Sequence, residues 1–410
     1  MNKRLGGIHI NDRIILHCDF NNFFASVSLL HNPTLKELPV AVCGDKESRH
    51  GIVLAKNEIA KKFGVKTAEP IFEAKTKCPE LIILPPIYKE YEKYSKSGLQ
   101  IYKRYTDMIE PFSIDECWLD VTGSTMLFGN GEQIAEKIRN DIKKELGITV
   151  SIGVSFNKVF AKLGSDMKKP DAVTVINREN YKEKIWCLPI SDMLFVGKKT
   201  CEKLKSAGIH TIGDLTYCDD TTLKRMLGKN GIDLKKCALG EDRSPVVTPT
   251  ENDKPKSVGK SFTGAKDFCS NDEVWKTFLS FSEYICDILK QKSLYAGGIQ
   301  VHIRTATLSV KEFSLSFSEP TNCSLTFAKR GFNLFCQNYS FGEPLRSVGL
   351  RAINIKDSRI AVQQDIFGED EQNLELERID ESLYDLRKKF GKESIVRGTI
   401  VKNFDYKLNK

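Results

Sequence analysis

Residues 112–121, FSIDECWLDV, place two adjacent carboxylates in front of a run of strand-forming residues. Pro111 precedes them and fixes φ, and a Thr-Gly-Ser tripeptide ends the run. We therefore expect a strand that follows a hairpin turn. Neighbouring side chains of an extended strand point to opposite faces of a sheet. Asp115 and Glu116 can serve one site only if a turn or bulge lies at this pair.

A second strand is predicted at residues 13–20, RIILHCDF, with Asp19 near its C-terminal end. A helical pattern begins directly after it, at residues 21–27. If Asp19 meets the acidic pair, three carboxylates converge, and these are ligands that Mg²⁺ prefers and shares with substrate phosphates. Two such ions can activate a hydroxyl nucleophile and stabilise leaving pyrophosphate. Taken singly, each residue also fits a simpler interpretation, a solvated turn for the pair and a helix cap for Asp19.

The composition indicates a globular protein of several domains. The chain has 410 residues, of which 40% are hydrophobic and 28% charged, and this length predicts two to four domains. No apolar run approaches the roughly 20 residues of a membrane span, and residues 1–7 lack the apolar core of a signal peptide. We therefore predict a cytoplasmic protein that makes no membrane contact. The formal charge of +8 suits a polyanionic partner.

The twelve cysteines contain no CxxC pair and have no His-x₃₋₅-His partner. This spacing argues against a zinc site and favours reduced thiols in the core. Cys18 and Cys117 flank the acidic residues and raise the alternative of redox sensitivity. Because side chains alternate along a strand, we expect both thiols to point into the core, away from any metal.

Two helices with buried faces are predicted on either side of the acidic stretch. The first carries a stripe of tyrosines at residues 88–105, which we interpret as core packing in preference to a surface that stacks nucleobases. The second carries Ile134, Ile138, Ile142 and Leu146, and a buried strand at residues 149–154 follows it. Strands and helices therefore alternate in the α+β manner.

Further along the chain, NKVFAK at residues 157–162 precedes DMKKP at residues 166–170. Together with the strand that ends in Asp19, FFASV at residues 23–27 and SIDE at residues 113–116, these blocks resemble the bacterial Y-family (DinB/UmuC-type) translesion DNA polymerases. The order and spacing match over most of the chain. The resemblance implies a low-fidelity, template-directed DNA polymerase that inserts deoxynucleotides opposite damaged template bases. Its implied partners are primer-template DNA and an incoming dNTP, and a monomer is expected.

The resemblance also implies an α+β right-hand polymerase with a ferredoxin-like palm, small fingers, a helical thumb and a βαββαβ little finger. Residues 181–243 contain short helices and tight turns, as a thumb would, and residues 244–256 are rich in Pro, Thr and charge, as a linker would be. The expected boundaries are palm 1–20 and 86–180, fingers 21–85, thumb 181–243, linker 244–256, little finger 257–362 and C-terminal tail 363–410.

Carried over residue by residue, the resemblance makes Asp19, Asp115 and Glu116 the catalytic carboxylates that hold two Mg²⁺ ions. A backbone carbonyl near Phe20 would be a further metal ligand. Asn21 stands where many members have Asp, a position outside the three metal carboxylates.

The resemblance places four further residues at the nucleotide. Phe24 aligns with the steric gate that excludes ribose, and Phe23 lies beside it with core packing as its alternative. Lys162 aligns with a lysine that contacts the triphosphate, although Lys158 and Lys162 could also form a solvated helix face. The family commonly has Tyr and Arg where this chain has Glu58 and Lys61. Lys61 still supplies a point charge for phosphate, whereas Glu58 does not stack as Tyr does.

The thumb and little finger supply the expected DNA contacts. Gly197 and Lys198 begin a segment that resembles a helix-hairpin-helix, whose backbone N–H groups contact DNA phosphate. Residues 254–362 hold 15 Lys and Arg against nine Asp and Glu, which favours a sequence-independent grip. Lys260, Arg304 and Arg351 are its candidate contacts.

A pentapeptide beyond the little finger is the candidate clamp contact. Residues 363–367, QQDIF, resemble the motif that binds the bacterial sliding clamp, with Gln363, Ile366 and Phe367 as its contacts. The alternative is an ordinary tail segment.

Two rival functions remain open at this point. A non-catalytic relative would scaffold a repair complex through the clamp motif, although such relatives lose metal carboxylates that this chain keeps. Another palm-fold enzyme, such as a nucleotide cyclase, would not need a basic C-terminal domain or a linker.

Overall fold

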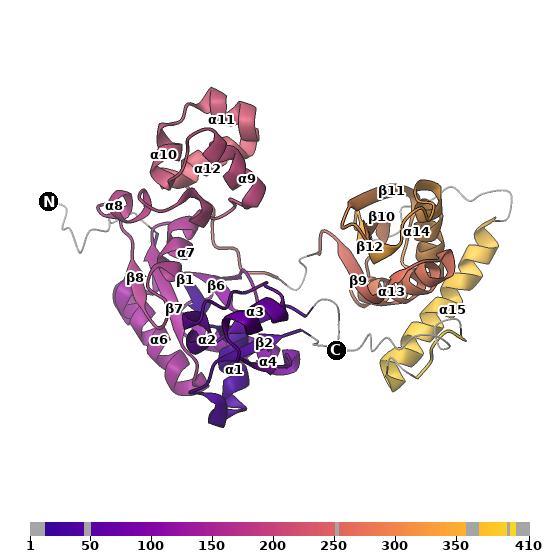
Figure 1. The fold of residues 1–410 in the computed structure, drawn as a ribbon, viewed down its shortest axis with the longest axis horizontal. Helices are drawn as coiled ribbons and strands as arrows, with labels where there is room; N and C mark the ends of the chain where they lie inside the picture. Colours follow the sequence, from indigo (N-terminus) through magenta and orange to yellow (C-terminus); the bar gives the residue numbers. More distant parts are fainter. Residues whose placement is uncertain (1–12, 45–50, 251–253, 358–368, 392–393, 399–410) are drawn as a thin grey trace. The chain divides into compact units, whose positions relative to one another are not determined.

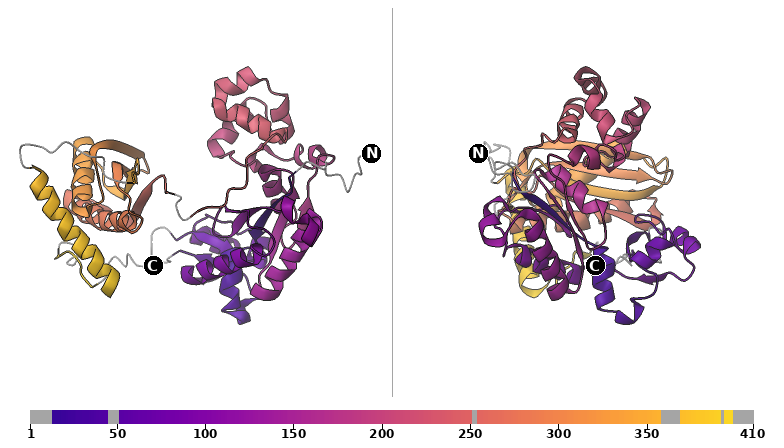
Figure 2. Two further views of the ribbon diagram at one scale, coloured as in Figure 1. Left: turned by 180° about the vertical axis from the view of Figure 1, so that it is seen from behind. Right: turned by 90° about the vertical axis from the view of Figure 1, so that its left-hand side faces the viewer.

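The computed structural model describes residues 13–44, 51–250, 254–357, 369–391 and 394–398. The chain divides into two compact units, residues 1–251 and 252–410, whose elements are drawn in Figures 1 and 2. In the described ranges, no helix is both long enough and apolar enough to cross a membrane. Strands and helices mix within each unit, as predicted for an α+β fold.

The region predicted as the palm contains a five-stranded sheet in the order β5-β6-β1-β7-β8. Its strands are β1 (Ile15–Phe20), β5 (Ile109–Pro111), β6 (Glu116–Asp120), β7 (Val150–Ser155) and β8 (Val173–Val175). The central strand β1 pairs antiparallel with both β6 and β7. All six residues of β1 are buried, which explains why its sequence is apolar apart from His17 and Asp19.

Helices cover both faces of the palm sheet. On one face, α4 (Tyr88–Tyr102) and α6 (Gly131–Leu146) share a core with Leu16 and Cys18. The predicted burial of Tyr91, Tyr102 and the three isoleucines of α6 is confirmed, as is that of Cys18 and Cys117. Tyr88 corrects the prediction of a buried stripe, because it begins α4 with 44% of its surface exposed.

On the other face, α7 (Lys158–Met167) packs closely against β7. This approach requires a glycine in β7, because a Cβ on Gly153 would lie 1.9 Å from the Ala161 carbonyl oxygen. The short elements η2 (Thr122–Ser124) and α5 (Thr125–Phe128) join β6 to α6.

The region predicted as the fingers contains a small sheet in the order β3-β2-β4. Its elements are α1 (Phe23–Leu30), η1 (Pro33–Leu35), β2 (Val40–Cys43), β3 (Val53–Lys56), α2 (Glu58–Lys62), α3 (Ile71–Lys77) and β4 (Ile82–Leu84). Asn57 caps α2 by accepting a hydrogen bond from Ala60 N. Gly64 follows α2 with φ of 82°, a left-handed conformation that favours glycine after the end of a helix.

Short helices joined by turns make up most of the region predicted as the thumb. It contains α8 (Tyr181–Ile185), η3 (Ile190–Asp192), α9 (Lys198–Ser206), α10 (Ile212–Tyr217), α11 (Asp220–Leu227) and α12 (Lys229–Ala238). Residues 244–250 of the expected linker then lie against the palm. Val246 is 2% exposed there, and Val247 N donates to Glu110 Oε2 at 2.8 Å. This part of the linker is therefore anchored to the first unit.

The second unit has the predicted βαββαβ order. Its elements are β9 (Val258–Phe268), α13 (Asn271–Gln291), β10 (Ala296–Thr305), β11 (Val310–Thr321), α14 (Ser324–Asn338) and β12 (Leu345–Ile353). The sheet order is β11-β10-β12-β9, and the two helices pack on one of its faces around Phe278 and Phe335. Among the described residues of this unit, no helix packs on the other face (Figure 2).

A further helix, α15 (Glu369–Phe390), lies within the stretch expected as a C-terminal tail and belongs to the second unit. Asp380 of α15 is buried and accepts hydrogen bonds from Lys290 and from the Ser324 backbone N–H. Arg387 Nη2 contacts Glu283 at 3.0 Å. Paired buried charges therefore fasten this helix to α13 and α14.

Candidate active site

The central carboxylates come from neighbouring strands. Asp19 of β1 lies directly opposite Glu116 of β6. Phe20 N donates to the Asp115 carbonyl at 3.1 Å, which makes the Phe20 and Asp115 positions a hydrogen-bonded pair. The next position, that of Asp19 and Glu116, is then a non-hydrogen-bonded pair, in which opposite side chains lie closest.

Asp115 reaches the same region because it precedes β6 in the turn after β5. Backbone N–H groups of Phe112 and Ser113 donate to the Glu116 carbonyl at 2.8 and 3.2 Å and close this turn. The Ser113 hydroxyl contacts both acids, Asp115 Oδ1 at 2.6 Å and Glu116 Oε2 at 3.2 Å. The turn thus lets two adjacent carboxylates serve one site, as the alternation argument requires.

Two lysines neutralise part of this negative charge. Lys162 Nζ of α7 donates to Glu116 Oε1 and lies 3.3 Å from Asp19 Oδ2. Lys169 Nζ donates to the same Asp19 oxygen at 2.7 Å and lies 2.8 Å from Asp166 Oδ1. Burial opposes the charged form of both lysines, but the carboxylates, Asp19 first, outweigh it and raise the pKa of each ammonium group.

Two of the three carboxylates, Asp19 and Asp115, have raised pKa values. Burial and the neighbouring Glu116 raise the pKa of Asp19 to about 6, against the opposing effect of Lys169 and Lys162. Burial, with a further contribution from Asp19, also raises the pKa of Asp115, although the Ser113 hydroxyl lowers it. Clustered acids of this kind gain stability from a bound cation.

A cavity of 350 Å³ opens beside the carboxylates. Asp19, Asp115 and Glu116 line one part of it, and Phe23 and Phe24 of α1 line another. The rest of its lining includes Phe20, Asn22, Leu54, Ala55, Lys56, Thr67, Ile114 and Lys169. An anionic ligand here would meet acids, aromatic rings and ammonium groups together.

The two phenylalanines of α1 are placed differently. Phe23 is 3% exposed and stacks on Phe20 with ring centroids 5.3 Å apart. Phe24 is half-buried and stacks in parallel on Tyr91 at 4.2 Å. Phe24 thus keeps a surface toward the cavity while its ring is held from behind.

The fingers residues singled out by the sequence do not line this cavity in the described part of the chain. Glu58 Oε1 accepts from Asn22 Nδ2 at 2.9 Å, and Lys61 lies 3.6 Å from the same oxygen with half of its side chain exposed. Lys56 and Thr67 line the cavity instead, and Lys56 Nζ donates to the Thr67 hydroxyl at 3.0 Å.

Lys169 and Lys56 are site residues that the sequence analysis did not assign. Lys169 belongs to the DMKKP block, so its place in that block was the available signal. Lys56 ends β3, where a polar side chain closes an apolar strand, a weaker signal. Burial lowers the pKa of Lys56, and Lys61 adds to that effect.

The donor set fits a divalent metal in its chemistry. In the described ranges, no three His, Cys, Asp or Glu side chains are already arranged around a metal position. The two ammonium groups lie against Asp19 and Glu116, where they balance charge that a cation would otherwise balance. Three carboxylates that border one cavity are hard oxygen ligands of the type that Mg²⁺ takes.

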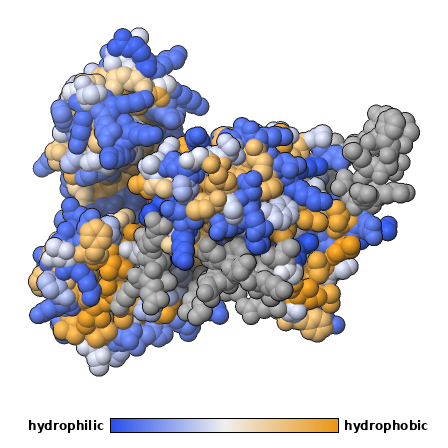
Figure 3. Space-filling view, turned by 45° about the vertical axis from the view of Figure 1, so that its right-hand side comes forward, coloured by the Kyte–Doolittle hydropathy of each residue, from blue (hydrophilic) through white to orange (hydrophobic). Residues whose placement is uncertain are grey.

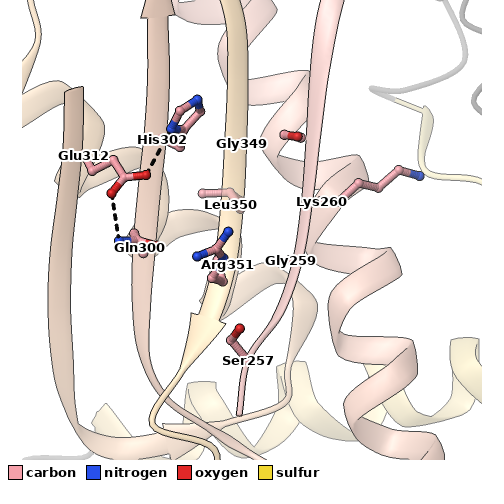
Figure 4. A pocket seen from close by; sticks show the side chains of 10 residues that line it. Ser257, Gly259, Lys260, Gln300, His302, Glu312, Gly349, Leu350 and Arg351 are labelled. Carbon is pink, nitrogen blue, oxygen red and sulfur yellow. Dashed lines mark hydrogen bonds and ion pairs between the residues drawn. The ribbon is translucent and has the colours of Figure 1, made fainter. Parts of the chain in front are cut away.

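The second unit presents a polar cavity of 590 Å³ on the open face of its sheet (Figure 4). Gln300, His302 and Arg351 line this cavity, and Glu312 accepts hydrogen bonds from Gln300 at 3.4 Å and His302 Nδ1 at 3.2 Å. Arg304 is exposed and lies two residues beyond His302 on β10, so it shares this face.

Lys260 is also among the residues that line this cavity, but its side chain lies toward the helices on the other side of the sheet. It pairs with Leu350 across β9 and β12, and Leu350 is a core residue that faces the helices. Its ammonium group lies 4.4 Å from the centre of the Tyr284 ring on α13, and Figure 4 shows it directed away from Arg351. Of the three basic residues predicted here, two therefore share the open face.

Gly197 and Lys198 begin α9 as predicted. Gly197 is the N-cap, no side chain caps the helix, and Lys198 and Lys199 are exposed in its first turn. The surface of this helical region is largely hydrophilic (Figure 3). Gln363, Ile366 and Phe367 lie outside the described residues.

The fold and the carboxylate cluster identify the protein as a right-hand palm enzyme that catalyses nucleotidyl transfer. Residues 18–166 match the impB/mucB/samB family and residues 255–366 match its C-terminal domain. The chain is 44% identical to DNA polymerase IV of Acetivibrio thermocellus over 95% of this chain and 98% of that protein. It is 37% identical to DNA polymerase IV 1 of Bacillus subtilis over 96% and 95%.

Solved structures agree with these relatives. A Y-family DNA polymerase chimera of Dbh and Dpo4 superposes with a TM-score of 0.73 and 27% identity, covering 83% of this chain and 99% of that one. The chain therefore belongs to the Y family of DNA polymerases, in its bacterial DinB-type branch. As a member of this family it is a metal-dependent, DNA-directed DNA polymerase of translesion synthesis.

Proposed function

We propose that this translesion polymerase uses Asp19, Asp115 and Glu116 to hold two Mg²⁺ ions during nucleotide insertion. The observation that carries the proposal is the register of the palm, which sets Asp19 directly opposite Glu116 with Asp115 in the adjoining turn. When bound, the ions would activate the primer hydroxyl and neutralise charge on the triphosphate. The Phe20 carbonyl is a further candidate ligand because Phe20 adjoins the cluster and lines the cavity.

The chain's own residues would bind and orient the nucleotide. Lys162 and Lys169 supply two ammonium groups beside the carboxylates, and Lys169 also lines the cavity, as does Lys56 from the region predicted as the fingers. A triphosphate that enters this cavity gains charge-assisted hydrogen bonds from them. Lys61 is a weaker source of positive charge for the triphosphate, because Glu58 already pairs with its ammonium group.

Phe24 is proposed as the steric gate. Its ring borders the cavity, and the parallel stack on the fully buried Tyr91 limits its retreat. A 2′-hydroxyl placed against a fixed ring would overlap it, because packed interiors do not yield readily. Phe23 would support the nucleotide indirectly, through its stack on Phe20.

Primer-template DNA would be gripped through its phosphates. Arg304 and Arg351 share the open face of the second unit, and the uncapped N-terminus of α9 offers backbone N–H groups at Gly197 and Lys198. Lys260 contributes less in this proposal because its ammonium group lies over Tyr284.

We also infer tethering to the bacterial sliding clamp by Gln363, Ile366 and Phe367. The support is the sequence of residues 363–367 together with their position between β12 and α15. A cytoplasmic location is inferred from the twelve cysteines, all of which are free thiols in this structure. A monomer remains a prediction.

The direct test is primer extension with purified protein on undamaged and lesion-bearing templates, with Mg²⁺ supplied or removed by EDTA. The proposal predicts Mg²⁺-dependent extension on both templates and none in EDTA. Gel-shift titration with the same primer-template, run in parallel, should show binding in both conditions. A protein that binds DNA but does not extend with Mg²⁺ or Mn²⁺ would act as a scaffold, an alternative that no present finding favours.

A further inference from the structure

His17, Asp19 and Asn21 are alternate residues that share one face of β1. All three are buried, with exposures of 0%, 5% and 4%. Asn21 lies just past the end of β1 but continues its pairing, since Asn21 N donates to the Thr149 carbonyl at 2.9 Å. Asp19 is therefore flanked, two residues to either side, by a buried polar side chain that faces the same way.

His17 is joined to the helix that carries Lys162. Ser165 Oγ donates to the Lys162 carbonyl at 2.7 Å, which uses the only hydroxyl hydrogen. The 2.9 Å contact between Ser165 Oγ and His17 Nδ1 must then have Nδ1–H as its donor. His17 Nε2 is buried and has no hydrogen-bond partner among the described residues. In the described part of the chain, the hydrogen bond of the His17 ring therefore leads through Ser165 to Lys162.

Asn21 is joined to the loop that carries Lys169. Its Oδ1 accepts from Asp171 N at 2.8 Å and from the Thr149 hydroxyl at 3.0 Å. Its Nδ2 donates to Ser151 Oγ at 2.8 Å, so the Thr149 and Ser151 contacts hold the Asn21 amide on the sheet and the Asp171 contact ties the loop to that amide. Asp171 is held from outside as well, by Arg139 at 2.8 Å and Lys143 at 2.7 Å.

The two lysines meet at one oxygen. Lys162 and Lys169 both contact Asp19 Oδ2, at 3.3 and 2.7 Å, although they lie on a helix and on the loop after it. Lysine is a flexible point charge, so its position depends on where its backbone is held. The helix is held by His17 through Ser165, and the loop is held by Asn21, just past the end of the strand that bears Asp19.

We propose that His17, through Ser165, and Asn21 are positioning residues that fix Lys162 and Lys169 against the catalytic carboxylates for triphosphate binding. This inference rests on the proposed function, because it assigns the lysines to the nucleotide. Neither His17 nor Asn21 touches substrate in this account. A small displacement of a binding group is enough to weaken its interaction with a reactant that must be held in one position.

The test uses the full-length protein, single-nucleotide insertion kinetics and two pinning variants, Ser165→Ala and Asn21→Ala. Each should raise KM for the dNTP about tenfold while kcat changes by less than about threefold. Asn21→Asp should restore KM, because a carboxylate keeps both acceptor contacts and Ser151 can donate to it. Ser155→Ala is the matched control, since Ser155 is a buried palm serine whose hydroxyl has no hydrogen-bond partner in the described ranges.

A double-mutant cycle separates positioning from general loosening of the palm. In a Lys162→Ala background, Ser165→Ala should cause no further rise in KM, and the same should hold for Asn21→Ala in a Lys169→Ala background. Additive effects, or unchanged KM in variants whose thermal unfolding matches the parent, would overturn the inference. If Lys162→Ala and Lys169→Ala themselves leave KM unchanged, the proposed nucleotide role of the lysines fails instead.

Discussion

Asp19 and Glu116 lie directly opposite each other on β1 and β6, at a pair that does not share backbone hydrogen bonds. Such a pair brings two carboxylates close together, which costs free energy unless a cation, a proton or an ammonium group intervenes. In this structure Lys162 and Lys169 fill that need. A bound cation would take over part of the charge balance that the two ammonium groups provide in this structure.

The first prediction concerns the stability of the metal-free protein. The pKa of Asp19 is raised to about 6 from an ordinary 3.8 by burial and by Glu116. Between about pH 4 and pH 6 the folded state then binds more protons than the unfolded state, so this residue makes stability fall as pH rises. The loss should be about 3 kcal/mol and should be complete above pH 6.

Urea unfolding in EDTA at several pH values measures this effect as the difference between the parent and Asp19→Asn. The parent should lose stability relative to the variant as pH rises through the window. Asp107→Asn, which removes an exposed acid in the same unit, is the control. A parent that gains stability relative to Asp19→Asn over this range would show that Asp19 is stabilised as a carboxylate.

The second prediction concerns sugar discrimination. Phe24→Ala removes the ring that borders the cavity, so ribonucleotides should be incorporated at least about a hundredfold more readily relative to deoxynucleotides. The measurement is the ratio of kcat/KM for a matched dNTP and rNTP pair. Phe72→Ala, which truncates a phenylalanine that is 70% exposed on α3, should leave the ratio unchanged. An active Phe24→Ala protein with parental discrimination would remove the gate from this position.

The third prediction concerns the DNA grip of the second unit. Arg304→Ala and Arg351→Ala should each weaken primer-template binding for any sequence and reduce the slope of log K against log salt by about 1. Lys260→Ala should have a smaller effect, because the Lys260 ammonium group lies over Tyr284 on the helical side. Equal salt slopes for the arginine variants and the parent would move the DNA contact to another surface.

The fourth prediction concerns the clamp. Replacing Ile366 and Phe367 together by Ala should remove stimulation by a loaded sliding clamp and leave distributive synthesis on short templates unchanged. Tethering acts by raising local concentration and makes no new contact at the active site. If the clamp stimulates the double variant as strongly as the parent, the tether lies elsewhere in the chain.

The sequence made the acidic centre predictable because local rules govern it. Alternation along a strand requires a turn at Asp115 and Glu116, and the turn is present. Lys169 was harder to foresee, since its contact with Asp19 spans 150 residues and depends on a loop held by Asn21. Lys260 shows a second limit. Its face depends on the register of β9 against β12, which net charge does not reveal.

Of the site roles that the resemblance implies, some fall on residues that lie at the carboxylates and others on residues that do not line the cavity. Lys162 follows a palm strand on a helix with a fixed approach, and it reaches both Asp19 and Glu116. Glu58 and Lys61 were aligned to nucleotide contacts, but their side chains interact with each other. Lys56 and Thr67 line the cavity because β3 and the stretch after α2 meet there, a tertiary effect that no single motif encodes.

The most direct test of the whole account is primer extension by Asp19→Ala, Asp115→Ala and Glu116→Ala, measured beside primer-template affinity. Losing a carboxylate that holds a catalytic ion should cost several kcal/mol of transition-state stabilisation, so each rate should fall by about 10³-fold or more. DNA affinity should stay near the parental value, because phosphate contacts elsewhere supply it. Near-parental extension by Asp115→Ala, with DNA binding intact, would contradict the assignment of this carboxylate cluster as the active site.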